Sequence, residues 1–226
     1  MDTKTINELF GITESYKAPE TLMNLLLGDA KQREKKFKQF LEVEWRVDQD
    51  WFHEYFQDEH ADRKMKKQDF TPNSIGKLLS RLLDPGIGSN LDVAAGTGGL
   101  TIIKWDADRK ETTPLDYYPN DYFYQCEELS DRSIPFLLFN LMIRGMNATV
   151  LHGDSLGREV KQIYFVQNEK NDFMGFSSLN IMLHSKDVER MFNVRKWLEE
   201  PIDHIESKEL PEHLSFIKQE VMANHD

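Results

Sequence analysis

The chain of 226 residues has very little cysteine and no long apolar run. Its one cysteine, Cys126, excludes an intramolecular disulfide and fits a reducing compartment. The most apolar run, residues 134–143, has about half the length that a membrane span needs. The first residues also lack the apolar stretch of a secretory signal. We therefore expect a cytoplasmic protein that makes no membrane contact.

Basic residues are too few for a protein that grips nucleic acid unaided. The chain has 28 Lys and Arg against 39 Asp and Glu, a formal net charge of −11. We expect such an acidic chain to bind DNA only weakly when alone. The histidines show no metal-ligand spacing, so no metal site is predicted. The length suits one α/β domain with a small appendage.

Residues 1–65 are predicted to form an N-terminal helical region. From residue 20 to 65, apolar side chains recur at three- and four-residue steps, which is helical spacing. A break precedes Asp29, which can cap the next helix. We interpret the basic run at 31–38 as a solvated face, and the aromatic stripe at 45–56 as core.

The pattern changes to alternating strands and helices in residues 66–226. Short strand-like runs separated by predicted helices lie at 91–93, 122–126 and 148–152. This order is typical of an α/β fold with a parallel sheet. Further along, residues 163–167 and 176–183 predict a hairpin, and residues 187–197 and 211–223 predict a charged helical tail.

A glycine-rich turn follows the first of these strands. Residues 91–99 read Leu-Asp-Val-Ala-Ala-Gly-Thr-Gly-Gly, so that Asp92 ends the strand and the glycines follow. Glycines let the backbone approach a ligand closely, and the start of a helix offers free N–H groups. The spacing is neither G-x-G-x-x-G nor a P-loop, so the turn alone could serve a dinucleotide, a phosphate or a nucleoside.

Acids also end the next two strands. Either Glu127 or Glu128 ends the second strand, and Asp154 ends the third. The carboxyl ends of parallel strands meet at one crevice, so these acids should face Asp92 across it. The second position suits a ribose diol and the third an adenine amine. This set predicts a site for S-adenosylmethionine, whose cation tolerates an acidic pocket.

The motifs together resemble the adenine-N6 DNA methyltransferases, and in particular the modification subunits of type I restriction–modification systems. The resemblance rests on Gln-Asp-Phe-Thr-Pro at 68–72, the turn at 91–100, Glu127-Glu128 and the segment 147–156. It implies a Rossmann-like, S-adenosylmethionine-dependent methyltransferase sheet behind the helical region. By family, the activity would be site-specific methylation of adenine in DNA.

The resemblance also implies which residues bind the cofactor. Those implied are Phe70, Thr71 and Pro72 at the methionine end, Asp92, Ala94, Gly96, Thr97 and Gly98 at the turn, Glu127 or Glu128 at the ribose, and Asp154 with Ser155 at the adenine.

The family's acceptor motif, Asn/Asp-Pro-Pro-aromatic, is missing because the sequence contains no Pro-Pro pair. That motif holds the adenine amino group and stacks on the flipped base. The nearest candidates by position, Asn168 and the run 171–173, are predicted to form a hairpin turn instead. The cofactor half is therefore present and the acceptor half is missing or rewritten, which predicts weak or absent DNA methylation.

Three classes of function remain open. The first is an adenine-N6 DNA methyltransferase whose acceptor loop has diverged or comes from another subunit. The second is a catalytically inactive relative, carried by a phage or mobile element, that acts on a restriction or regulatory protein. The third is a small enzyme that acts on S-adenosylmethionine itself. The missing motif and the negative charge favour the second over the first as a statement of activity. A protein partner is expected in addition to the cofactor.

Overall fold

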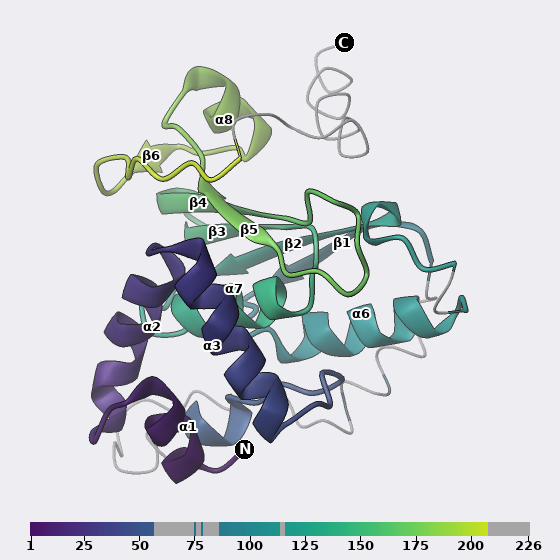
Figure 1. The fold of residues 1–226 in the computed structure, drawn as a ribbon. Helices are drawn as coiled ribbons and strands as arrows, with labels where there is room; N and C mark the ends of the chain where they lie inside the picture. The colour runs from purple at the N-terminus through teal and green to yellow at the C-terminus, as the bar shows by residue number, and fades with distance from the viewer. Residues whose placement is uncertain (57–74, 76–77, 79–85, 114–115, 208–226) are drawn as a thin grey trace.

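A computed structural model describes residues 1–56, 75, 78, 86–113 and 116–207 (Figure 1). Phe70, Thr71 and Pro72 lie outside the described residues, as does the predicted tail at 211–223. The N-terminal region contains α1 (Thr3–Phe10), the 3-10 helix η1 (Ser15–Lys17), α2 (Ala18–Leu26) and α3 (Ala30–Val43). The α/β part contains β1 (Gly88–Val93), α6 (Gly99–Lys110), η2 (Pro119–Asp121), β2 (Tyr122–Glu128), α7 (Ile134–Ile143), β3 (Ala148–Asp154), β4 (Glu159–Gln167), β5 (Ser178–Ile181), α8 (Lys186–Met191) and β6 (Lys196–Trp197).

The strands form one mixed sheet in the order β1-β2-β3-β4-β5, with β6 paired to β4. β1, β2 and β3 run parallel, whereas β4 is antiparallel to β3 and β5 is antiparallel to β4. This confirms the predicted α/β fold and the predicted hairpin. The helix predicted at 187–197 is too long, because it ends at Met191 and Lys196–Trp197 pairs with β4 as a strand. Trp197 packs there against Leu151, Val160 and Ile163.

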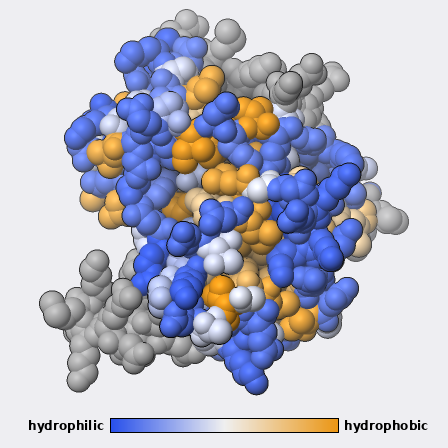
Figure 2. All heavy atoms as spheres, turned by 60° about the vertical axis from the view of Figure 1, so that its left-hand side comes forward, coloured by the Kyte–Doolittle hydropathy of each residue, from blue (hydrophilic) through white to orange (hydrophobic). Residues whose placement is uncertain are grey.

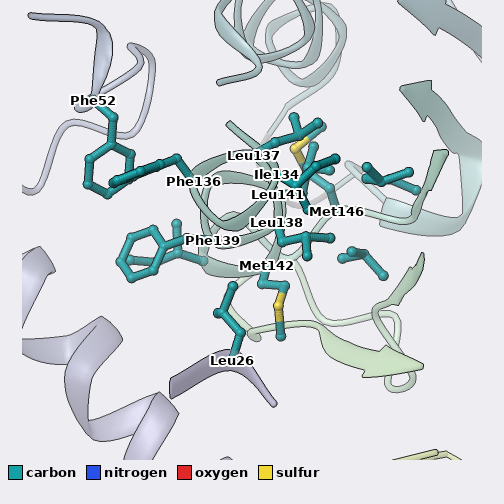
Figure 3. Close-up of a cluster of buried hydrophobic side chains, with 14 of the residues drawn as sticks. Leu26, Phe52, Ile134, Phe136, Leu137, Leu138, Phe139, Leu141, Met142 and Met146 are labelled. Atoms are coloured by element: carbon teal, nitrogen blue, oxygen red, sulfur yellow. The ribbon is translucent and has the colours of Figure 1, made fainter. Parts of the chain in front are cut away.

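The main core lies between the sheet and the N-terminal helices. α6 and α7 lie on one face of the sheet, and α1 to α3 lie beyond α7 (Figure 1). Every residue of α7 is buried, which is typical of a helix packed on all sides. Figure 3 shows Phe136 and Phe139 pointing toward Phe52, while Leu137 and Leu141 point the other way. No helix of the described residues is long and apolar enough to cross a membrane.

The prediction of helix throughout residues 20–65 is wrong between α3 and residue 52. α3 ends at Val43, and the following backbone carbonyls accept side-chain hydrogen bonds instead of helical ones. The break before Asp29 is confirmed, because its carboxylate accepts from Gln32 N at 3.0 Å and caps α3. The predicted aromatic core holds for Trp51 and Phe52 but not for Trp45, which is 78% exposed.

The basic run at 31–38 is exposed at Lys31, Lys35 and Lys38, whereas Lys36 is half-buried and donates to Leu9 O at 2.6 Å. At Arg33 the prediction of a solvated face is wrong. Arg33 is buried and donates to both carboxylate oxygens of Glu206 at 2.6 Å and to Leu26 O at 2.7 Å. Its partner lies far along the chain, so no local pattern signals the pair.

Hydrophilic residues predominate on the face of the molecule seen in Figure 2, with hydrophobic patches between them.

Candidate functional site

A cavity of about 570 Å³ opens at the carboxyl ends of β1, β2 and β3. Asp92 from β1, Glu128 from β2 and Asp154 from β3 all line it. Small-molecule sites commonly have volumes of about 300–1,000 Å³. The structure thus brings the acids of three parallel strand ends around one space large enough for a nucleoside-sized ligand.

The glycine turn forms one wall of this cavity. Ala94, Gly96 and Gly98 have φ of 69°, 60° and 93°, so the backbone is left-handed at three positions. Ala94 N and Ala95 N both donate to the backbone O of Glu127 at 2.9 Å, which ties the turn to β2. A Cβ on Gly98 would lie 2.8 Å from Leu137 Cδ1, so this approach to α7 and the φ of 93° both favour glycine here. α6 then begins without a side-chain cap at Gly98.

Asp92 is held at the floor of the site. Its Oδ2 accepts from Thr101 Oγ1 at 2.7 Å. Burial raises the pKa of Asp92, the nearby charge of Glu128 adds to this, and the hydrogen bonds from Thr101 oppose it. A cationic ligand beside these two acids would favour their charged forms.

Glu127 and Glu128 point to opposite faces of the sheet, and Glu128 is the one that lines the cavity. Glu128 is 4% exposed, and its two carboxylate oxygens accept from Gly96 N and Ser130 N, each at 2.7 Å. Both carboxylate oxygens of Glu127 instead accept hydrogen bonds from Arg158 Nη1, each at 2.9 Å. Of the two acids that the sequence left open, Glu128 is the one available to a ligand in the cavity.

Asp154 and Ser155 close the side of the cavity beyond β3. Asp154 Oδ1 accepts from Leu156 N at 2.9 Å and fixes a tight turn after the strand. The β3–β4 register shifts between His152 and Gly153. A Cβ on Gly153 would lie 2.3 Å from the backbone O of Glu159, so this close strand approach requires glycine.

Asp50 is a cavity-lining residue that the sequence reasoning missed. Thr97 Oγ1 donates to Asp50 Oδ2, and Asn140 Nδ2 donates to Asp50 Oδ1 at 2.9 Å. The same Asn140 Nδ2 also donates to the backbone O of Thr97 at 2.8 Å. Asp50 thus contacts the glycine turn from the N-terminal region. The sequence around Asp50 contains no motif that predicts this contact. His53 lines the cavity beside it.

Arg144 anchors the segment that carries Asp50. It is 5% exposed, and its guanidinium donates to Val47 O at 2.8 Å, Gln49 O at 2.7 Å and the backbone O of Asn140 at 2.8 Å. Burial lowers the pKa of Arg144 to about 9, while the charge of Asp50 opposes the shift. The group therefore remains cationic at neutral pH and fixes the N-terminal segment onto α7.

The nearest candidates for an acceptor motif lie at the end of the sheet opposite the cavity. Antiparallel pairing places Glu159 opposite Asp154 and Val166 opposite Ala148, so β4 ends where β3 begins. Residue 168 is therefore about 20 Å from the cavity edge, at roughly 3.3 Å per strand residue. Asn168 Nδ2 donates to Gly145 O and Asp172 O at 2.8 Å, which confirms the predicted turn.

Cys126 is a buried residue of the core. It is 1% exposed, and burial raises the pKa of its thiol to about 12, so it is not a thiolate nucleophile at neutral pH. Within the described part of the chain, no group of three metal-ligating side chains comes together.

The family model of the N-6 DNA methylases matches residues 50–174, more than half of the 226 residues. The match begins at Asp50 and runs through the turn, β2, β3 and β4. No curated protein and no solved structure matches the chain.

Proposed function

Because the chain belongs to the N-6 DNA methylase family, we propose that it binds S-adenosylmethionine and methylates DNA weakly or not at all on its own. The observation that carries this proposal is the convergence of Asp92, Glu128 and Asp154 on one cavity beside the glycine turn. Family members typically use this cofactor, and the convergence supplies the acceptors that it needs.

The side chains that line the cavity fit the chemistry of the cofactor. Glu128 would accept from the ribose hydroxyls, and Asp154, with Ser155 beside it, from the adenine amino group. Among the described residues, no Lys or Arg forms an ion pair with Asp92, Glu128 or Asp154. Their negative charge is therefore available to a cationic ligand. When bound, the cofactor supplies a methyl group for transfer.

Two further groups of residues would complete the cofactor site. Asp50 holds the turn through Thr97 and adds a carboxylate near the start of α6. The Phe-Thr-Pro motif at 70–72 is still expected at the methionine end of the cofactor, by resemblance to the family. It lies outside the described residues.

Weak methylation follows from what surrounds this cavity. The chain has no Pro-Pro pair, and the asparagines nearest in position lie in the β4–β5 turn at the opposite sheet edge. The net charge of −11 also disfavours DNA binding by the chain alone. Transfer to adenine would then require residues that this chain does not supply.

Calorimetric titration with S-adenosylmethionine tests the proposal. We expect a micromolar dissociation constant for the wild type and an affinity at least ~10-fold weaker for Asp92→Ala, since charged hydrogen bonds contribute about 1.5–3 kcal/mol. Glu128→Gln should also weaken binding, whereas the matched variant Glu127→Gln should leave it nearly unchanged. Thermal unfolding of each variant checks that it is folded. No binding at millimolar cofactor, or equal losses in the two glutamine variants, would overturn the proposal.

A further inference from the structure

β1 is an edge strand, although the cavity is built on its carboxyl end. Among the described residues its one strand neighbour is β2, so the other side of its backbone has no ladder partner. Edge strands commonly carry Lys, Pro or a bulge that blocks pairing with other chains. β1 reads Gly-Ser-Asn-Leu-Asp-Val and has none of these.

The face of β1 turned away from α7 is apolar and exposed. Asp92 pairs in register with Cys126, which belongs to the main core, so Leu91 and Val93 on either side point to the opposite face. Leu91 is 60% exposed and Val93 is 52% exposed. Strands at the interior of a parallel sheet normally have both faces covered.

Two further exposed apolar side chains lie at the rim of the cavity. Leu129 is 63% exposed and Leu156 is 90% exposed, and both line the cavity together with Val93. We call Leu91, Val93, Leu129 and Leu156, with the free edge of β1, the β1 surface. It joins a strand edge that has no ladder partner among the described residues, exposed large apolar side chains and the mouth of the proposed cofactor site.

We propose that the β1 surface docks a second, basic polypeptide that adds a strand parallel to β1 and supplies the adenine-binding loop. This inference rests on the proposed function, in which the chain binds the cofactor but does not itself supply the residues that bind adenine. The carboxyl end of a strand added in parallel would lie beside the carboxyl ends of β1, β2 and β3. The loop after it would therefore open directly over the cavity. Its apolar side chains would cover Leu91 and Val93.

The charge of the chain selects a basic partner. A net charge of −11 attracts a cationic polypeptide and repels DNA, so the partner would also bring the phosphate-binding groups. A second copy of this chain fits poorly, because it carries the same charge and has no Pro-Pro loop.

A synthetic peptide tests the surface directly. The probe is a strand of alternating Val and Lys followed by Asn-Pro-Pro-Tyr, and the control peptide has the same composition with Pro placed inside the strand. Binding is followed by fluorescence polarisation, and hydrogen exchange of residues 88–93 reports whether β1 is paired. Leu91→Lys removes an apolar contact and adds repulsion without touching the cavity. Leu183→Lys is the matched control, because Leu183 is 64% exposed elsewhere.

We expect the probe to bind, to slow exchange at 88–93, and to lose at least ~10-fold in affinity in Leu91→Lys but not in Leu183→Lys, a change of about 1.4 kcal/mol. Equal binding to both variants, or unchanged exchange in β1, would overturn the proposal. A wild-type dimer that Leu91→Lys dissociates would assign the surface to a second copy and would overturn it too. S-adenosylmethionine affinity is measured separately on the same samples, so failure of the cofactor site is distinguished from failure of the surface.

Discussion

The two faces of the sheet differ sharply in how they are covered. On one face α7 is buried along its whole length, and the aromatic side chains of the N-terminal region pack against it. On the other face, a small cluster with α8 and β6 covers Leu151, Val160 and Ile163, while Leu91 and Val93 on β1 remain exposed. The covered face holds the glycine turn in place through α7, and the exposed face leaves apolar side chains of β1 uncovered beside the cavity.

Truncating one residue on each face should give the largest contrast. Phe139 lies 4.8 Å from the ring centroid of Phe40 and 4.9 Å from that of Phe37. Phe139→Ala should lower the free energy of unfolding by about 3–5 kcal/mol, because it leaves a cavity in a packed core. Leu91→Ala should change it by no more than ~0.5 kcal/mol. Urea unfolding followed by circular dichroism measures both, and similar losses would mean that the two faces are equally packed.

Removing a buried arginine should give the next largest effect. Arg144→Met leaves the carbonyls of Val47 and Gln49 without their donor, and we expect a loss of about 3 kcal/mol and weaker cofactor binding. Arg109→Met is the matched control, since both guanidinium groups lie over a tryptophan ring. Arg109 pairs with Asp106 near the surface, so its loss should stay below ~1 kcal/mol. If urea unfolding gave equal losses of free energy for the two variants, the buried hydrogen bonds of Arg144 would stabilise the fold no more than the Arg109 ion pair does.

The smallest effect should come from the ionisation of Asp92. Burial raises its pKa, so the folded protein holds this proton more tightly than the unfolded chain does. The stability that protonated Asp92 contributes is therefore present at low pH and is lost as pH rises through its folded pKa. Asp92→Asn should raise the melting temperature at neutral pH by about 1–2 °C. That difference should vanish below the ordinary value of 3.8, and a gain that is independent of pH would contradict the assignment.

Local patterns in the sequence predicted the parts of this molecule that local physics decides. The strands, the β4–β5 hairpin and the glycine turn followed from apolar runs and turn residues, and the topology of parallel strands placed three acids together. Asp50 could not be predicted as a cavity residue, because it reaches Thr97 across 47 residues of sequence. The same holds for the burial of Arg33 by Glu206, 173 residues away.

The choice between Glu127 and Glu128 shows the same limit. Both acids end the strand, and alternation sends one to each face, but the sequence does not say which face holds the cavity. The structure decides this through Arg158, which pairs with Glu127 from 31 residues away. Distant side chains thus determine which of two equivalent motif positions is available to a ligand.

The central claim is that the chain binds the cofactor and lacks an effective acceptor site of its own. One sample of the purified chain with methyl-labelled S-adenosylmethionine and adenine-containing duplex DNA tests both halves together. We predict label bound to the protein at micromolar cofactor and little or no label in the DNA. Efficient, multiple-turnover transfer of label to adenine by the chain alone, lost in Asp92→Ala, would contradict the claim.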